Sequence, residues 1–125
     1  MITCAVRGAV QLERDDREEF CAAVKRLVST LLARNTIAES DIVSVVFSQT
    51  RDLVSANPAA CLRRSGFSDT ALFCTQEPEY PDSLPRVVRV LITFNTDAEE
   101  RKPEPAYLDG AEQLRPDVAA RYEQR

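Results

Sequence analysis

Histidine and tryptophan are missing from this 125-residue sequence, which also holds only one methionine and three glycines. Without histidine, neither Ser-His-Asp nor Cys-His catalysis is available, and no imidazole can shuttle protons. The four cysteines, Cys4, Cys21, Cys61 and Cys74, form no CxxC pair, so the ligands of a zinc site are largely lacking. If the chain is an enzyme, we expect it to use neither a metal nor imidazole chemistry.

Long apolar runs are absent as well. No stretch approaches the roughly 20 apolar residues that cross a bilayer, and the first residues indicate a strand rather than a signal peptide. We therefore expect a cytoplasmic protein whose four cysteines all stay reduced. The formal net charge of −4 disfavours nucleic acid or an anionic membrane as a partner. Any anion-binding function must depend on a local cluster of cations.

Hydrophobic periodicity predicts one mixed α/β (α+β) domain covering residues 1–125, with the order β-α-β-α-β-β. Strands are expected at 2–12, 42–48, 70–76, 86–95 and near 106–108. A long helix is expected at 16–34, capped by Asp15 or Asp16, and a short one should begin near Pro58 and end at Ser65-Gly66. Gly8 is expected to mark a bulge or a close approach, and the tail should fray after about residue 116.

The strand at 86–94 is apolar on both faces, which indicates cover on both sides. One face carries Val88, Val90, Ile92 and Phe94, and the other carries Val87 and Leu91. One long helix and one short helix cannot cover both faces of a four- or five-stranded sheet. We expect another subunit to complete the core on the second face.

Arg89 lies in the middle of this strand, where a guanidinium is costly to bury without an anionic or electron-rich partner. The alternative is an edge-strand arginine that reaches water. Arg7 repeats the pattern on the first strand, and taken alone it is most simply a solvated strand-end residue. Arg63 suits the end of a short helix for dipole reasons, and Arg115 would ordinarily be a tail charge.

Other candidates also have ordinary interpretations. Cys74 is typical of a small buried hydrophobe, Glu77 of a solvated loop acid, and Tyr107 of packing. Taken together, these interpretations do not explain why an acidic protein places several arginines at strand ends and within strands.

Seven segments, in order and covering most of the chain, carry a family resemblance. They are AVRGAVQLERD at 5–15, DL-x4-PA at 52–59 with Arg63, CTQE at 74–77, LPRVVRV at 84–90, NTD at 95–97, AYL at 106–108 and LRPD at 114–117. Together they resemble the trimeric, non-helical class of chorismate mutases. The resemblance implies a homotrimer forming a pseudo-α/β-barrel, with one active site at each subunit interface.

The resemblance also implies roles for particular residues. Arg7 and Arg63 would pair with the carboxylates of chorismate, and Arg89 would reach the ether oxygen of the breaking bond. Glu77 and Cys74 would contact the ring hydroxyl. The remaining implied contacts are Asn57, Ala59, Phe73 and Tyr107 in the pocket, and Leu114 and Arg115 in a tail that closes over it. Arg89, Glu77 and Arg7 would be the catalytic residues.

The implied reaction fits the composition. Conversion of chorismate to prephenate is an intramolecular rearrangement, which needs no acid, base, nucleophile, metal or cofactor. The enzyme must hold a dianion in its reactive conformer and oppose the negative charge that builds on the ether oxygen. Arginines can do both.

Two positions depart from the family pattern. Asn57 stands where members commonly have Phe, and Ala60 where some have a charged residue; one residue is also missing between Arg63 and Gly66. These changes leave two alternatives open. One is an enzyme of the same fold that acts on a chorismate-like metabolite of a specialised pathway. The other is a non-catalytic trimer that binds a small anion.

Overall fold

The computed structural model describes residues 1–98 and 102–118. Its elements follow the predicted order, and their bounds lie within about two residues of the predicted ones. In chain order they are β1 (Ile2–Gln11), α1 (Arg17–Asn35), the 3₁₀ turn η1 (Glu39–Asp41), β2 (Ile42–Gln49), α2 (Pro58–Arg64), β3 (Leu72–Gln76), β4 (Val87–Thr96), β5 (Ala106–Leu108) and the 3₁₀ turn η2 (Ala111–Leu114).

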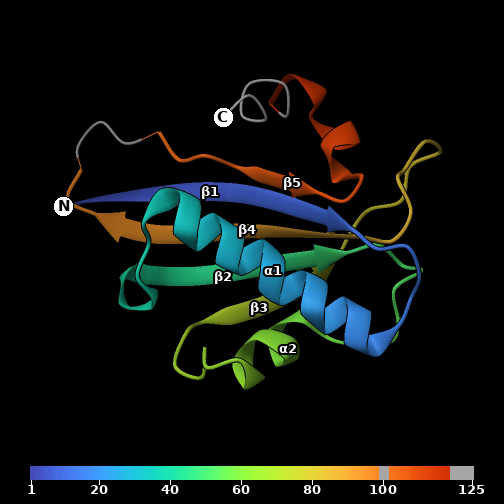
Figure 1. Ribbon diagram of the computed structural model, residues 1–125, viewed down its shortest axis with the longest axis horizontal. Coiled ribbons are helices and arrows are strands. Elements are labelled where there is room, and N and C mark those ends of the chain that lie inside the picture. The colour runs from blue at the N-terminus through green and yellow to red at the C-terminus, as the bar shows by residue number, and fades with distance from the viewer. Residues whose placement is uncertain (99–101, 119–125) are drawn as a thin grey trace.

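The strands form one mixed sheet in the order β3-β2-β4-β1-β5, as Figure 1 shows. The central strand β4 pairs antiparallel with both β1 and β2, whereas the edge strands β3 and β5 pair parallel with β2 and β1. The predicted mixed sheet is therefore confirmed. The proline-bearing segment at 77–86 lies outside the sheet, because proline cannot donate to a strand ladder.

Helix α1 begins where the sequence supplies a cap. Asp16 is the N-cap residue, and its carboxylate accepts the backbone N–H of Glu19 at 3.0 Å. Asp15, the other candidate, instead accepts the backbone N–H groups of Val54 and Ser55 at 3.0 and 3.1 Å. It thereby ties the start of α1 to the loop that leads into α2.

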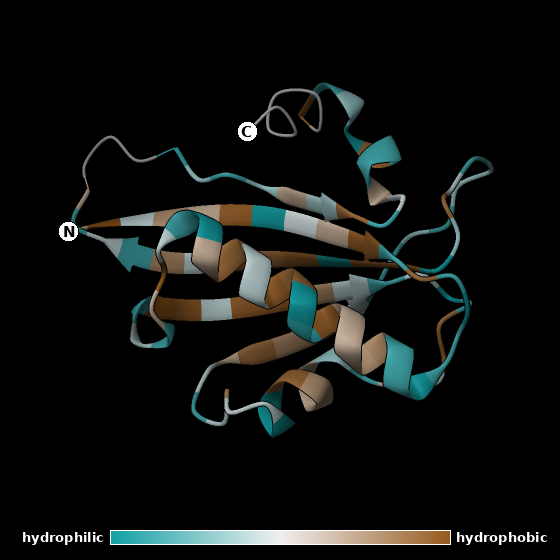
Figure 2. Ribbon diagram, viewed as in Figure 1, coloured by the Kyte–Doolittle hydropathy of each residue, from teal (hydrophilic) through white to brown (hydrophobic). Residues whose placement is uncertain are grey.

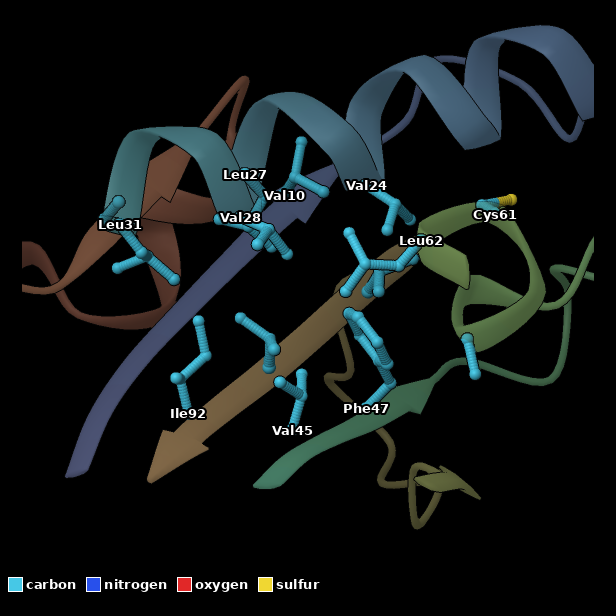
Figure 3. Close-up of a cluster of buried hydrophobic side chains, with 14 of the residues drawn as sticks. Val10, Val24, Leu27, Val28, Leu31, Val45, Phe47, Cys61, Leu62 and Ile92 are labelled. Atoms are coloured by element: carbon cyan, nitrogen blue, oxygen red, sulfur yellow. The ribbon is translucent and has the colours of Figure 1, made fainter. Parts of the chain in front are cut away.

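Both helices pack on the same face of the sheet (Figure 1), and the main hydrophobic core lies between them and the strands. Figure 2 shows hydrophobic residues concentrated in the central strands and hydrophilic residues in the loops. In Figure 3, side chains of α1 and α2 meet those of the strands: Val24, Leu27, Val28, Leu31 and Leu62 face Val10, Val45, Phe47 and Ile92. The absence of a side chain at Gly8 permits this packing, because a Cβ there would lie 2.9 Å from both Ala106 O and Leu31 Cδ1. Gly8 is thus the predicted close approach.

The opposite face of the sheet is only partly covered. Near its end, Val87 is buried beneath a small cluster that includes Ala9 and Ala111. Farther along the same face, Leu91 is 39% exposed and Phe73 is 64% exposed. The predicted apolar character of both faces of β4 is confirmed, and the second face remains largely open in a single chain.

The described part of the tail extends beyond the predicted fraying point. Val118 is buried, and its N–H donates to Arg115 O at 3.1 Å. The rest of the tail, residues 119–125, lies outside the described residues. No helix within 1–98 or 102–118 is long and apolar enough to cross a membrane.

The expectation that all four cysteines are reduced is wrong. Cys21 on α1 and Cys61 on α2 form a disulfide, while Cys4 and Cys74 are free thiols. The two bonded residues are separated by 40 positions in sequence, but packing of α2 against α1 brings their Cα atoms to 5.2 Å, within the range that a disulfide spans. A sequence without CxxC spacing gave no sign of this pair. The cytoplasmic location stays a prediction.

Reducing this disulfide should lower the free energy of unfolding by about 2–4 kcal/mol, because the bond restricts the unfolded chain. Urea denaturation with and without dithiothreitol measures the difference. The Cys21→Ser/Cys61→Ser double variant is the control, and its midpoint should not respond to the reductant. Titration of thiols in the denatured, unreduced protein should find only Cys4 and Cys74; reaction of all four cysteines would contradict the assignment.

Candidate active site

An ion pair between Arg89 and Glu77 stands on the open face of the sheet. Arg89 Nε lies 3.1 Å from Glu77 Oε1, with the side chain of Arg89 45% exposed and that of Glu77 18% exposed. Arg89 belongs to β4, the central strand, so the interpretation as an edge-strand arginine is wrong. Its anionic partner is a carboxylate from a segment 12 positions earlier in the sequence. The two therefore meet only through the sheet.

Backbone pairing places Glu77 beside Arg89. Glu77 directly follows β3, and its N–H donates to Gln49 O at 2.9 Å, which continues the pairing of β3 with β2. Along its other edge β2 pairs with β4, and there Ser48 lies directly opposite Arg89. The hydroxyl of Ser48 donates to Glu77 Oε1. Sequence reasoning missed Ser48, since only the register of three strands reveals its contact.

Beside this pair is a hollow of about 320 Å³, lined by three of the predicted arginines. Arg7 lies on β1 opposite Leu91, and Tyr107 lies on β5 opposite Ala9, so both share the open face with Arg89. Arg115, from the segment after η2, completes the set. Three guanidinium groups at one hollow form the local cation cluster that an acidic protein needs to bind an anion.

The segment after β5 borders the site. Arg115 pairs with Asp117 at 3.0 Å. The hydrogen bond and the negative charge of Asp117 raise the pKa of the Arg115 guanidinium, and the same hydrogen bond lowers the pKa of the Asp117 carboxyl. Leu114 lines a second hollow of about 370 Å³, which Glu77 and Arg89 also line. Leu114 and Arg115 thus each border a hollow that Arg89 lines.

Arg7 carries an unpaired guanidinium, as far as the described residues extend. It makes no ion pair or hydrogen bond through its side chain with any residue in 1–98 or 102–118. Arg63, exposed in the last turn of α2, is likewise unpaired within the same ranges. Both residues can therefore bind a carboxylate without first losing a partner from the described part of the chain.

Four of the other predicted residues, Asn57, Ala59, Arg63 and Cys74, lie on the helix side of the sheet. Asn57 caps α2 by accepting the Ala60 N–H at 3.0 Å, and the Cys74 thiol lies 3.4 Å from the same Asn57 oxygen. Ala59 is 6% exposed and packs in the hydrophobic core. Arg63 extends from the same helix. These residues form a second group, on α2 and β3.

Within one chain, Cys74 does not lie beside Glu77, although both are predicted to contact the ring hydroxyl of the substrate. Successive residues of a strand point to opposite faces. Cys74 lies opposite Phe47 on the helix-covered face, whereas Phe73 lies on the open face. The sheet therefore separates Cys74 from Glu77, and one chain supplies two groups of candidate residues that do not meet.

No group of three or more Cys, Asp and Glu side chains within residues 1–98 and 102–118 is arranged to hold a metal ion. The open face instead carries guanidinium groups and the carboxylate of Glu77, most of them held by regular strands. Such an arrangement can bind a small dianion and stabilise negative charge that develops on it.

Comparisons with known proteins identify the family of this chain. The family model described as chorismate mutase type I matches residues 3–118. Chorismate mutase AroH of Thermus thermophilus is 38% identical over 114 residues, covering 90% of this chain and 93% of that protein. Chorismate mutase AroH of Bacillus subtilis is 32% identical over 120 residues, covering 95% and 94%. A solved chorismate mutase from Clostridium thermocellum superposes with a TM-score of 0.84 at 35% identity, covering 89% of this chain and 99% of that one. The chain therefore belongs to the type I chorismate mutase family.

Proposed function

We propose that this chorismate mutase works as a homotrimer, with each active site completed across a subunit boundary. The observation that carries the proposal is the Arg89–Glu77 pair beside a hollow lined by Arg7, Arg89 and Arg115. The reaction is the rearrangement of chorismate to prephenate, and the enzyme is an isomerase. What remains to be assigned is the role of each residue.

Arg89 is assigned to the ether oxygen of chorismate. Its Nε faces Glu77, so its two terminal nitrogens are left to contact the substrate. As the C–O bond breaks, negative charge grows on the ether oxygen, and a fixed guanidinium opposes that charge without having to reorganise. Glu77, held against Arg89, offers its second oxygen to the ring hydroxyl.

Arg7 and Arg63 are assigned to the two carboxylates. Their guanidinium groups can form paired hydrogen bonds with a carboxylate, and holding both ends restricts the substrate to its compact conformer. Arg7 lies on the open face, whereas α2 carries Arg63 on the helix side. In this proposal Arg63, Asn57 and Cys74 therefore come from the neighbouring subunit.

The open face supports a trimer. Leu91 and Phe73 are exposed on it, and Val43 of the same sheet is 48% exposed. Apolar residues on a sheet surface that lacks helical cover are typical of a subunit interface. A neighbour seated there would also bring its α2 and β3 within reach of Arg7 and Arg89.

The purified protein should remove the absorbance of chorismate without added metal or cofactor, and the rate should survive a chelator. Between about pH 6 and 8, kcat should change little, because the chain has no histidine to titrate in that window. A stopped assay that quantifies prephenate confirms the product.

Two results would count against the proposal. A steep bell-shaped profile between pH 6 and 8 would indicate general acid–base catalysis and a different mechanism. Absence of turnover by folded protein would favour a chorismate-like substrate or a binding role. Binding of chorismate, measured by calorimetry, separates those two outcomes.

A further inference from the structure

One carboxylate oxygen of Glu77 makes two contacts, an ion pair with Arg89 and a hydrogen bond with Ser48. Arg89 Nε faces Oε1 at 3.1 Å, and the Ser48 hydroxyl donates to the same Oε1. Ser48 lies directly opposite Arg89 in the pairing of β2 with β4, and Glu77 follows β3 on the other side of β2 (Figure 1). Three neighbouring strands thus bring one hydroxyl, one carboxylate and one guanidinium together.

Because both contacts use Glu77 Oε1, the other carboxylate oxygen and the terminal nitrogens of Arg89 are left available. Among residues 1–98 and 102–118, Glu77 Oε2 and the terminal nitrogens of Arg89 have no bonding partner. A terminal carboxylate torsion is broad and turns easily when nothing restrains it. The Ser48 hydroxyl restrains it, because the side chain of Ser48 stands on a paired strand and is itself partly buried.

We propose that Ser48 is a positioning residue for the reaction. By restraining the rotation of the Glu77 carboxylate, it holds one oxygen against Arg89, sets the direction of the terminal guanidinium nitrogens and leaves the second oxygen for the substrate. This inference rests on the proposed roles of Arg89 and Glu77. Ser48 acts through Glu77, and no contact between Ser48 and the substrate is required.

The kinetic test removes the hydroxyl. Ser48→Ala should lower kcat about tenfold, the effect of losing a hydrogen bond to a charged group, with little change in KM. Ser48→Thr retains the hydroxyl on a side chain suited to a strand and should recover most of the rate. Ser44→Ala is the matched control, because Ser44 is a serine on the same strand and face but does not contact Glu77. It should keep wild-type kinetics.

A double-mutant cycle shows whether Ser48 acts through Glu77. In a Glu77→Ala background, Ser48→Ala should add almost nothing to the loss, because its partner is already gone. An undiminished tenfold loss in that background would overturn the proposal, as would a wild-type kcat for Ser48→Ala. If Ser48→Ala fails to fold, Ser48→Cys, which keeps the volume but donates weakly, takes its place with the same expectations.

A second readout does not depend on turnover. The NMR signal of the Arg89 Nε–H, identified by its loss in Arg89→Lys, should exchange with water faster in Ser48→Ala than in wild type or Ser44→Ala. Unchanged exchange would show that Ser48 does not restrain the pair, whatever the activity. If the wild-type protein failed to turn over chorismate, the proposed function would fail, while this measurement would still decide the role of Ser48.

Discussion

Replacing Arg89 with alanine should reduce kcat at least 10²–10³-fold, roughly 3–4 kcal/mol, with a much smaller rise in KM. The reason is that its charge opposes negative charge that exists fully only in the transition state. Arg7→Ala should behave differently, because a carboxylate clamp acts on the ground and transition states alike and its loss should mainly raise KM. Steady-state kinetics on both variants, with folding checked by circular dichroism, measure the contrast.

Two further changes at position 89 separate charge from shape. Citrulline keeps the shape and most donors of arginine but is neutral, so it should bind chorismate nearly normally and restore little of kcat. Arg89→Lys keeps the charge but loses the planar fork, and its recovery should be partial. A folded Arg89→Ala enzyme with near wild-type kcat would show that the pair with Glu77 is structural, and the mechanism would be wrong at its central residue.

At a chorismate concentration far below the raised KM of a carboxylate-clamp variant, where each variant alone has little activity, mixing two variants should restore activity if each site draws on two subunits. Arg89→Ala damages the group on the open face, and Arg63→Ala damages the group on α2. When such chains are refolded together into random trimers, about one quarter of the sites should combine an intact open face with an intact neighbouring α2. Activity should therefore rise from the low level of either variant toward about one quarter of wild type.

The matched control mixes Arg89→Ala with Arg7→Ala. Both residues lie on the open face of one chain, so every site in a mixed trimer still contains one lesion and activity should stay low. Light scattering on the same samples should report a trimer of the 14.0 kDa chain. A stable monomer, or no gain in the first mixture, would show that the two groups do not combine across subunits.

Some features of this fold were accessible from local sequence. Residue patterns predicted strands β1 and β4 and the apolar character of both faces of β4, and two neighbouring acids, Asp15 and Asp16, marked the start of α1. Local chemistry decided these features, because a cap or a strand face depends on neighbours a few residues away. The family, too, followed from short motifs spread along the chain.

Contacts between distant segments were not accessible in this way. The separation of residues along the sequence predicted neither the Cys21–Cys61 disulfide nor the location of Cys74 and Glu77 on opposite faces of the sheet. Both depend on how α2 and β3 pack. The partners of Arg89 depend on strand register for the same reason.

The sequence by itself thus determined the elements, the arginine candidates and the family, because these depend on residue type and local period. Only the tertiary structure decided that Arg89 stands on the central strand, that Ser48 and Glu77 bond beside it, and that Arg63 and Cys74 lie on the other side of the sheet. The physical reason is that strand pairing converts positions far apart in the chain into neighbours, and alternation then assigns each to one face.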